Sequence, residues 1–204
     1  MNMTSATLSF AEHALIYHQR EKVATPLLIE TGLVCLRRLF ADGRVVVIDV
    51  VGAGEAIGNL SAQREWIATE EAVALNAVRC TPLPPLAAEN GMVAATDTRL
   101  VRALMQRESR LKDRLVSQIS ETVEQRVIRA LDYLAGLFNV PCVHGYSLEI
   151  MLTQQELADI VCASRPVVSQ VLNKFKEQKL LDYTAQQFCV RPELLRKRRE
   201  ADAD

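Results

Sequence analysis

The stretch Thr153–Gln178, TQQELADIVCASRPVVSQVLNKFKEQ, decides the fold of the C-terminal part of the chain, because it predicts two helices joined by a tight turn. Thr153 and Glu156 have the spacing of a capping box, in which each side chain accepts a hydrogen bond from a free backbone N–H at the helix start. Ser164 is the expected N-cap of the second helix. Pro166 falls in its first turn, where a missing N–H costs little.

The second predicted helix has one apolar and one polar face at about 100° per residue. The apolar face carries Val168, Val171, Leu172 and Phe175. The other face is polar without an acid. Such a face is also typical of an ordinary solvated helix, but the short turn and the paired caps favour a surface that reads DNA. The expected DNA-binding residues are Arg165, Pro166, Ser169, Gln170, Asn173, Lys174, Thr153 and Gln154.

Within this set, the side-chain chemistry predicts different roles. Arg165 lies in the first turn and can donate two hydrogen bonds to guanine O6 and N7. Gln170 can pair with adenine, and Ser169 is short enough to reach a phosphate or a thymine methyl group. Lys174, at the far end of the helix, is expected to contact a phosphate.

These motifs resemble those of the cyclic-AMP receptor / fumarate-nitrate regulator (CRP/FNR) superfamily of bacterial transcription factors. The most specific match runs from Leu152 to Ala158 and from Ser164 to Leu172, and a weaker one covers Val51–Leu60. The resemblance implies an N-terminal sensor domain, a helix that forms a homodimer seam, and a winged helix-turn-helix. Two reading helices about 34 Å apart would then bind a near-palindromic site on double-stranded DNA. RNA polymerase is a further partner that the resemblance implies.

Composition predicts an ordinary soluble, cytoplasmic protein. The chain has 204 residues, of which 49% are hydrophobic and 24% charged, and its net charge is −1. Any DNA-binding surface must therefore arise from local charge. The sequence shows neither a secretory signal nor an apolar run long enough to span a membrane. The five cysteines include no Cys-x-x-Cys pair, which favours buried, reduced thiols over a disulfide framework or a zinc site.

Short β-branched runs between residues 14 and 87 predict an antiparallel β-roll. The runs Leu27–Ile29, Gly32–Leu36 and Arg44–Val51 are separated by glycines, and Asp42-Gly43 is a strong hairpin signal. The fold class predicted is thus α+β.

A candidate effector pocket lies at the end of this roll, and its residues disfavour a cyclic nucleotide. A cyclic phosphate needs glycine N–H groups and a cation, and a ribose hydroxyl favours a carboxylate. Gly54, Glu55 and Gly58 retain the backbone part, but Asn59 stands where the resembled family has its acid. Two acids, Glu70-Glu71, stand where an Arg-Ser or Arg-Thr pair is expected, and as unpaired carboxylates they would repel a phosphate. Arg64 could replace the missing cation if the loop is longer.

No cofactor or metal is expected. An iron–sulfur cluster needs closely spaced cysteines near the N-terminus, and Cys35 is the first. A lone histidine is more often a surface residue than a haem ligand. Cys162, in the turn before the reading helix, is the candidate redox thiol, because its oxidation would place charge beside DNA phosphates; a packing role is the alternative.

A long helix over residues 97–120 predicts a dimer seam. Its narrow apolar stripe consists of Leu100, Leu104, Leu111, Leu115 and Ile119. Packing on the β-roll is the alternative use of this stripe. A second amphipathic helix, Glu121–Phe138, follows a hinge near Ser120–Thr122. Residues 139–146 then predict a loop and residues 148–152 a strand, and the runs Leu180–Tyr183 and Gln187–Val190 predict the hairpin of a wing.

The predicted domains are a β-roll (1–94), a dimerisation helix (95–121) and a winged helix-turn-helix (122–204). The predicted function is sequence-specific transcription regulation by a homodimer that needs no cyclic nucleotide. Alternatives are a regulator gated by an unknown ligand or by thiol oxidation, and a cyclic-nucleotide-binding module that acts on a protein partner. An enzyme is not expected, because no nucleophile–base pair, metal spacing or phosphate loop is present at useful positions.

Overall fold

The chain forms two compact units, Met1–Asp113 and Arg114–Asp204. The structure is a computed structural model, and it describes residues 7–60, 66–84, 88–89, 92–93, 98–138, 140–142, 145–148, 152–184 and 188–201. The boundary between the units falls inside helix α1 (Thr98–Ser120).

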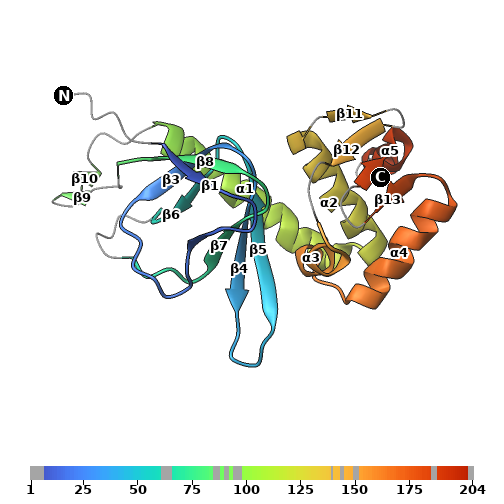
Figure 1. The fold of residues 1–204 in the computed structure, drawn as a ribbon, viewed down its shortest axis with the longest axis horizontal. Helices are drawn as coiled ribbons and strands as arrows, with labels where there is room; N and C mark the ends of the chain where they lie inside the picture. Colours follow the sequence, from blue (N-terminus) through green and yellow to red (C-terminus); the bar gives the residue numbers. More distant parts are fainter. Residues whose placement is uncertain are drawn as a thin grey trace. The chain divides into compact units, whose positions relative to one another are not determined.

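The first unit is an antiparallel β-roll, as the sequence predicts (Figure 1). One sheet has the strand order β1-β8-β3-β6 and the other has the order β2-β7-β4-β5. The strands are β1 (Leu8–Phe10), β2 (Leu15–Tyr17), β3 (Pro26–Thr31), β4 (Val34–Leu39), β5 (Val45–Val51), β6 (Ala56–Gly58), β7 (Glu71–Ala74) and β8 (Val78–Pro82), followed by the short pair β9 (Ala88–Glu89) and β10 (Met92–Val93). Their inward residues form one apolar core that includes Ile29, Leu36, Val51 and Ile57.

Turn residues set the register of this roll. β4 and β5 form the long hairpin that Asp42-Gly43 predicts, with Leu39 paired to Val45 (Figure 1). The Asp42 side chain accepts a hydrogen bond from the Arg44 N–H at 3.1 Å, and Gly43 has a φ of 83°. Gly32 has a φ of 91°, and a Cβ there would lie 2.4 Å from the Ala77 carbonyl oxygen. Only glycine fits that turn without strain.

The N-terminal half of α1 packs on the roll. Leu100 and Ala103 are buried in a small core with Ala56 and Leu83, and Leu104 packs against it. These contacts hold the N-terminal half of α1 on the β-roll.

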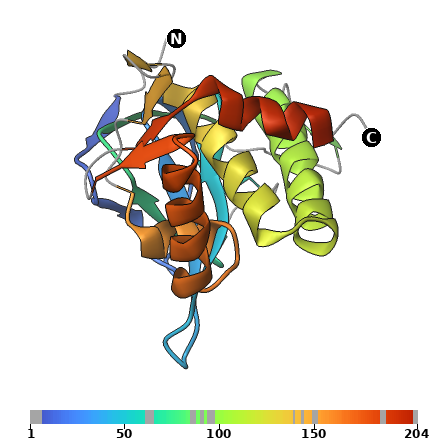
Figure 2. The same cartoon turned by 90° about the vertical axis from the view of Figure 1, so that its right-hand side faces the viewer.

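The second unit is a helix-turn-helix with a four-stranded sheet of order β11-β12-β14-β13. Its elements are α2 (Val123–Phe138), β11 (Val140–Cys142), β12 (Gly145–Leu148), α3 (Gln154–Ile160), α4 (Arg165–Glu177), β13 (Leu181–Tyr183), β14 (Phe188–Val190) and α5 (Pro192–Ala201). Helix α2 contacts α3, α4 and α5, and Figure 2 shows α5, in red, crossing α2, in yellow. The core contains Leu131, Leu157, Leu172, Phe175 and Phe188.

Two local expectations differ from the structure. Residues 139–146 are expected to be a loop, yet β11 and β12 pair with each other there, and β12 also pairs with β14, which comes from far along the chain. Of the strand expected at 148–152, Leu148 is the last residue of β12, Leu152 is in no strand, and residues 149–151 lie outside the described part. Among the described helices, none is both long and apolar enough to cross a membrane.

Candidate functional site

Helices α3 and α4 with the turn between them form the helix-turn-helix, called the reader below. Both helices begin where their predicted caps lie. The Glu156 N–H donates to the Thr153 hydroxyl at 3.1 Å, and the Thr153 N–H donates to the Glu156 carboxylate at 2.8 Å, which completes the capping box. Ser164 is the N-cap of α4 by backbone geometry, although its side chain makes no capping bond. Cys162 lies in the turn with a φ of 50°, a conformation that L-residues seldom adopt.

Helix α4 exposes its polar face and buries its apolar face. Val168, Leu172 and Phe175 are fully buried, which fixes the rotation of the helix about its axis. The exposed residues include Arg165, Pro166, Gln170, Asn173 and Lys174, and Ser169 is half-buried. The candidate base-reading side chains therefore share one accessible face.

Tyr183 of β13 links two of the predicted DNA contacts. Its hydroxyl donates to Asn173 Oδ1 at 2.8 Å and lies 3.4 Å from Gln154 Nε2. The Tyr183 ring stacks on Phe188, with ring centroids 5.7 Å apart, and the Lys176 ammonium lies 5.1 Å from the Tyr183 ring centroid. Strand β13 thus positions the polar ends of α3 and α4, a role that the sequence gives no local sign of.

Lys174 has an acidic neighbour within the same unit. Its Nζ lies 2.6 Å from Glu124 Oε2 at the start of α2. The pair is partly exposed, so it is worth little in stability. A DNA phosphate that binds Lys174 must compete with Glu124, which reduces the expected gain from this contact.

The last turns of α1 contact the turn of the reader. Arg114 Nη2 donates to the Ile160 carbonyl oxygen at 2.8 Å and lies 3.9 Å from Cys162 Sγ. At the α1–α2 hinge, Glu121 accepts a 2.7 Å hydrogen bond from Ser117 and forms an ion pair with Arg129. These bonds tie the end of α1 to the helix-turn-helix.

The first unit contains buried carboxylates that have arginine partners, and Glu55 of the predicted effector pocket is one of them. Asp49, Glu55, Glu70 and Glu71 are each exposed by 8% or less. The sequence alone suggests that Glu70 and Glu71 are unpaired, and the structure corrects this expectation. Glu71 lies 2.6 Å from Arg37 Nε, and Glu70 lies 3.9 Å from Arg107 Nη2.

Two of these arginines come from α1. Arg110 pairs with Asp49 at 3.0 Å and also with Glu55, whose other oxygen accepts the Gly52 N–H at 2.7 Å. Arg107 and Arg110 are one turn apart, so one face of α1 delivers both guanidinium groups to the roll. Their partners lie far away in the chain, and no local motif marks the two arginines.

Of the remaining predicted pocket residues, Gly54 lies in the turn between β5 and β6, Gly58 is the last residue of β6, and Asn59 follows it. Gly54 and Gly58 both have positive φ, and a Cβ on Gly58 would lie 3.0 Å from the Thr25 carbonyl oxygen, so glycine is needed there for backbone packing. Asn59 is fully buried. Burial, and then the charge of Glu70, hold the pKa of Tyr17 above its usual value, so its hydroxyl stays protonated. Arg64 lies outside the described residues.

The apolar stripe of α1 is divided between two uses. Leu100 is fully buried in the roll and Leu104 packs there, so neither side chain faces outward as a seam residue, and Leu111 is half-buried. The exposed fractions of Met105, Leu115 and Ile119 are instead 69%, 62% and 81%. The exposed apolar face of α1 is therefore rotated about the helix axis relative to the predicted stripe, although Leu115 and Ile119 belong to both.

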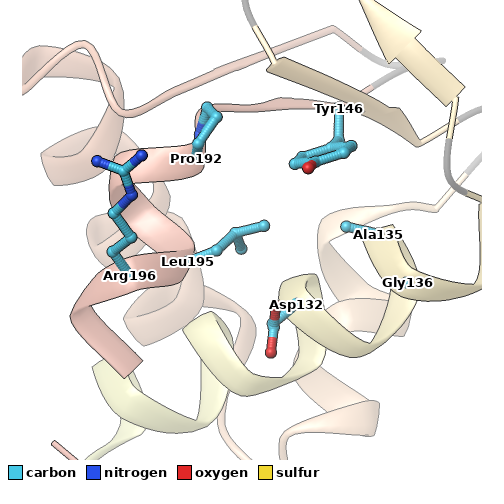
Figure 3. Close-up of a pocket in the computed structure, with 7 residues that line it drawn as sticks. All are labelled: Asp132, Ala135, Gly136, Tyr146, Pro192, Leu195 and Arg196. Atoms are coloured by element: carbon cyan, nitrogen blue, oxygen red, sulfur yellow. The ribbon is translucent and has the colours of Figure 1, made fainter. Parts of the chain in front are cut away.

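A pocket of about 290 Å³ lies in the second unit between α2, β12 and α5 (Figure 3). In Figure 3, Leu195 lies between Pro192 and Ala135, while the Arg196 guanidinium points away from the pocket. The labelled polar groups do not converge on one point. Within the described residues, no group of three or more His, Cys, Asp or Glu side chains could hold a metal ion.

A β-roll with a cyclic-nucleotide-type turn, followed by a capped helix-turn-helix with a wing, defines a DNA-binding regulator. A family model described as a cyclic nucleotide-binding domain matches residues 7–92, and one described as a Crp-like helix-turn-helix domain matches residues 125–198. The chain belongs to the CRP/FNR superfamily, and it is a CRP-like transcriptional regulator with a helix-turn-helix DNA-binding domain. The families matched are those of regulators, not of enzymes.

Individual relatives agree with this assignment. The chain is 29% identical over 152 residues to the CRP-like cAMP-activated global transcriptional regulator of Mycobacterium tuberculosis, a match that covers 72% of this chain and 67% of the relative. A CRP-family regulator from Thermus thermophilus has a TM-score of 0.79 at 22% identity, covering 94% of this chain and 96% of that one. A second CRP/FNR regulator from that organism has a TM-score of 0.77 at 18% identity, covering 98% and 99%. At these identities the structures establish the fold.

Replacing Arg165 by alanine should relax base preference. We expect Arg165→Ala to cost on the order of 1–3 kcal/mol on the preferred site, because a bidentate contact to guanine is lost. Fluorescence anisotropy on that site and on one with the guanine replaced measures the difference. Lys174→Ala is the matched control and should weaken both sites alike. Equal weakening by Arg165→Ala would make Arg165 a backbone contact.

Removing Arg110 should destabilise the first unit. Arg110→Met leaves Asp49 and Glu55 buried without their guanidinium, and the cost expected is about 3 kcal/mol of unfolding free energy. Arg102→Met, at an exposed position of the same helix, should change stability by less than about 0.5 kcal/mol. Urea unfolding of both variants tests this. Similar small changes in both would mean that the ion pairs contribute nothing net.

Proposed function

We propose that this regulator acts as a homodimer that binds a near-palindromic DNA site without a cyclic nucleotide. The observation that carries the proposal is the set of ion pairs by which α1 is held on the roll. Arg107 and Arg110 already neutralise buried acids in the pocket, so α1 docks without a ligand to join it to the roll.

The charge pattern of the pocket supports ligand independence. A cyclic phosphate is best bound by cations on the roll, whereas here the roll contributes the buried acids Asp49, Glu55, Glu70 and Glu71, and its Arg37 already pairs with Glu71. An entering phosphate would have to break guanidinium–carboxylate pairs and leave buried carboxylates uncompensated, which is costly. The Mycobacterium tuberculosis relative is named as cAMP-activated; in this chain we infer a different means of control.

A homodimer is supported by a heptad pattern on the exposed side of α1. Val101, Met105, Glu108, Lys112, Leu115 and Ile119 follow one another at spacings of four and three, the a and d spacing of a coiled coil. All six are exposed. Arg107 and Arg110, which pair with the roll, lie on the opposite side, so one helix can serve both contacts.

The middle of this seam carries opposite charges. Glu108 and Lys112 form an i,i+4 ion pair on one helix. In a parallel pair of helices, Glu108 of one copy can also reach Lys112 of the other in the adjacent layer, so the four charges compensate one another. A polar layer of this kind fixes the register at some cost in stability. The second copy of this chain is thus the partner that we propose for this face.

Further partners follow from the same role. DNA is the target, so we place the protein in the cytoplasm, and RNA polymerase is the partner that a regulator at a promoter would contact.

DNA selection tests the function. The untreated protein, incubated with a random DNA pool and no added nucleotide, should enrich a near-palindrome whose half-sites are centred about 34 Å apart. Sequencing of the bound fraction gives the site. If enrichment requires cyclic AMP, cyclic GMP or a cell extract, ligand independence is wrong. If no sequence is enriched under any condition, the reader does not recognise bases.

Charged substitutions in the seam test the dimer. Met105→Glu with Ile119→Glu should give monomers, because each places unpaired charge in an apolar layer. Gln106→Glu, exposed on the same helix but outside the heptad positions, should remain dimeric. Light scattering during gel filtration measures the mass. A dimeric double variant would place the interface elsewhere.

A further inference from the structure

Two thiols of the DNA-binding unit are in direct contact. Cys142 Sγ and Cys189 Sγ lie 2.7 Å apart, compared with about 2.05 Å for the covalent bond of a disulfide. Both thiols are half-buried, whereas Cys35 and Cys80 are buried and Cys162 is exposed. The pair lies 47 residues apart in sequence, so spacing alone does not reveal it.

The sheet brings these thiols together across β12. Cys142 of β11 pairs with Gly145, and Cys189 of β14 pairs with Ser147. Because side chains alternate along a strand, all four residues are on the same face of the sheet. Gly145 has no side chain and Ser147 has a short one. The sulfur atoms can therefore meet above the strand that separates them.

Gly145 is also required by the backbone at this place. Its φ is 147°, and a Cβ there would lie 2.3 Å from the Val190 carbonyl oxygen. The close approach of β12 to the end of β14 thus depends on this glycine. The register of the sheet holds the two cysteines together.

We propose that Cys142 and Cys189 form a reversible disulfide within one chain when the protein meets a peroxide. The Cys142 thiolate attacks one oxygen of hydrogen peroxide, which breaks the O–O bond and gives a sulfenic acid and hydroxide. The hydroxide takes up the proton released by the thiol and leaves as water. Cys189 sulfur then displaces the sulfenic hydroxyl, which leaves with the Cys189 proton as a second water. Two electrons pass from the thiols to the peroxide.

The order of these steps follows from the surroundings of the thiols. The pKa of Cys189 is raised to about 11. Burial is the largest cause, followed by the hydrogen bond to Cys142 and the negative charge of Cys142. Asp182, which pairs with Cys189 across β13 and β14, adds in the same direction. Cys189 therefore keeps its proton at neutral pH and acts second. The reaction should become faster as the pH rises, because the thiolate and not the thiol is the nucleophile.

The cross-link would enclose the whole reader. Helices α3 and α4 and strand β13 all lie between Cys142 and Cys189 in the chain. Closing a loop of this length removes entropy from the unfolded state. Oxidised protein should therefore keep the helix-turn-helix folded at temperatures at which reduced protein loses it. This inference does not depend on which DNA site or effector the protein uses.

Oxidation of the full chain tests the proposal. After treatment with hydrogen peroxide, the thiol count under denaturing conditions should fall from five to three, that is 5 − 2. The mass should fall by about 2 Da, dithiothreitol should reverse both changes, and peptide mapping without reductant should join the peptides of Cys142 and Cys189. The melting temperature of the second unit should rise by about 10 °C or more.

Single-thiol variants separate this pair from the exposed thiol. Cys142→Ser and Cys189→Ala should each abolish the mapped disulfide and the rise in melting temperature, while Cys162→Ser should retain both. Peptide mapping of the wild-type protein decides the matter even if one variant fails to fold. A count that remains at five, oxidation confined to Cys162, or a disulfide between two chains would each overturn the proposal.

Discussion

The first unit depends on the pairing of α1 arginines with buried carboxylates of the roll. Arg110 holds Asp49 and Glu55, and Arg107 faces Glu70. Burying a carboxylate without a partner is costly, so these acids define where α1 must lie. The apolar contact of Leu100 and Ala103 also holds α1 on the roll, but it is less specific, because apolar packing does not require a particular partner as a buried charge does. The arginines thus fix which face of α1 is turned to the roll.

That choice of face has consequences along the same helix. With Arg107 and Arg110 turned to the roll, the opposite side exposes Met105, Leu115 and Ile119, which we assign to the dimer. Further along, Arg114 contacts the turn of the reader through the Ile160 carbonyl oxygen. One helix therefore carries residues for the roll, for a second copy and for the DNA-binding unit.

Local signals predict much of this structure. The Thr153–Glu156 capping box, the proline in the first turn of α4 and the Asp42-Gly43 hairpin each involve neighbouring residues, so the sequence displays them. Long-range pairings are different. The Arg110–Asp49 contact joins residues 61 positions apart, and β12 pairs with β14, whose residues come much later in the chain. The apolar spacing of α1 predicted a stripe but not which of its residues the roll would cover.

The central claim is that internal ion pairs take the place of a cyclic nucleotide. Calorimetric measurement of cyclic-nucleotide binding tests this claim most directly. Cyclic AMP and cyclic GMP are titrated separately into the full-length protein, and the same solutions are added to DNA-bound protein. We expect no saturable heat with ligand up to about millimolar concentration, a range in which binding is worth only about 4 kcal/mol. A micromolar dissociation constant for either nucleotide would contradict this role of the ion pairs, because the carboxylates would then have to admit a phosphate.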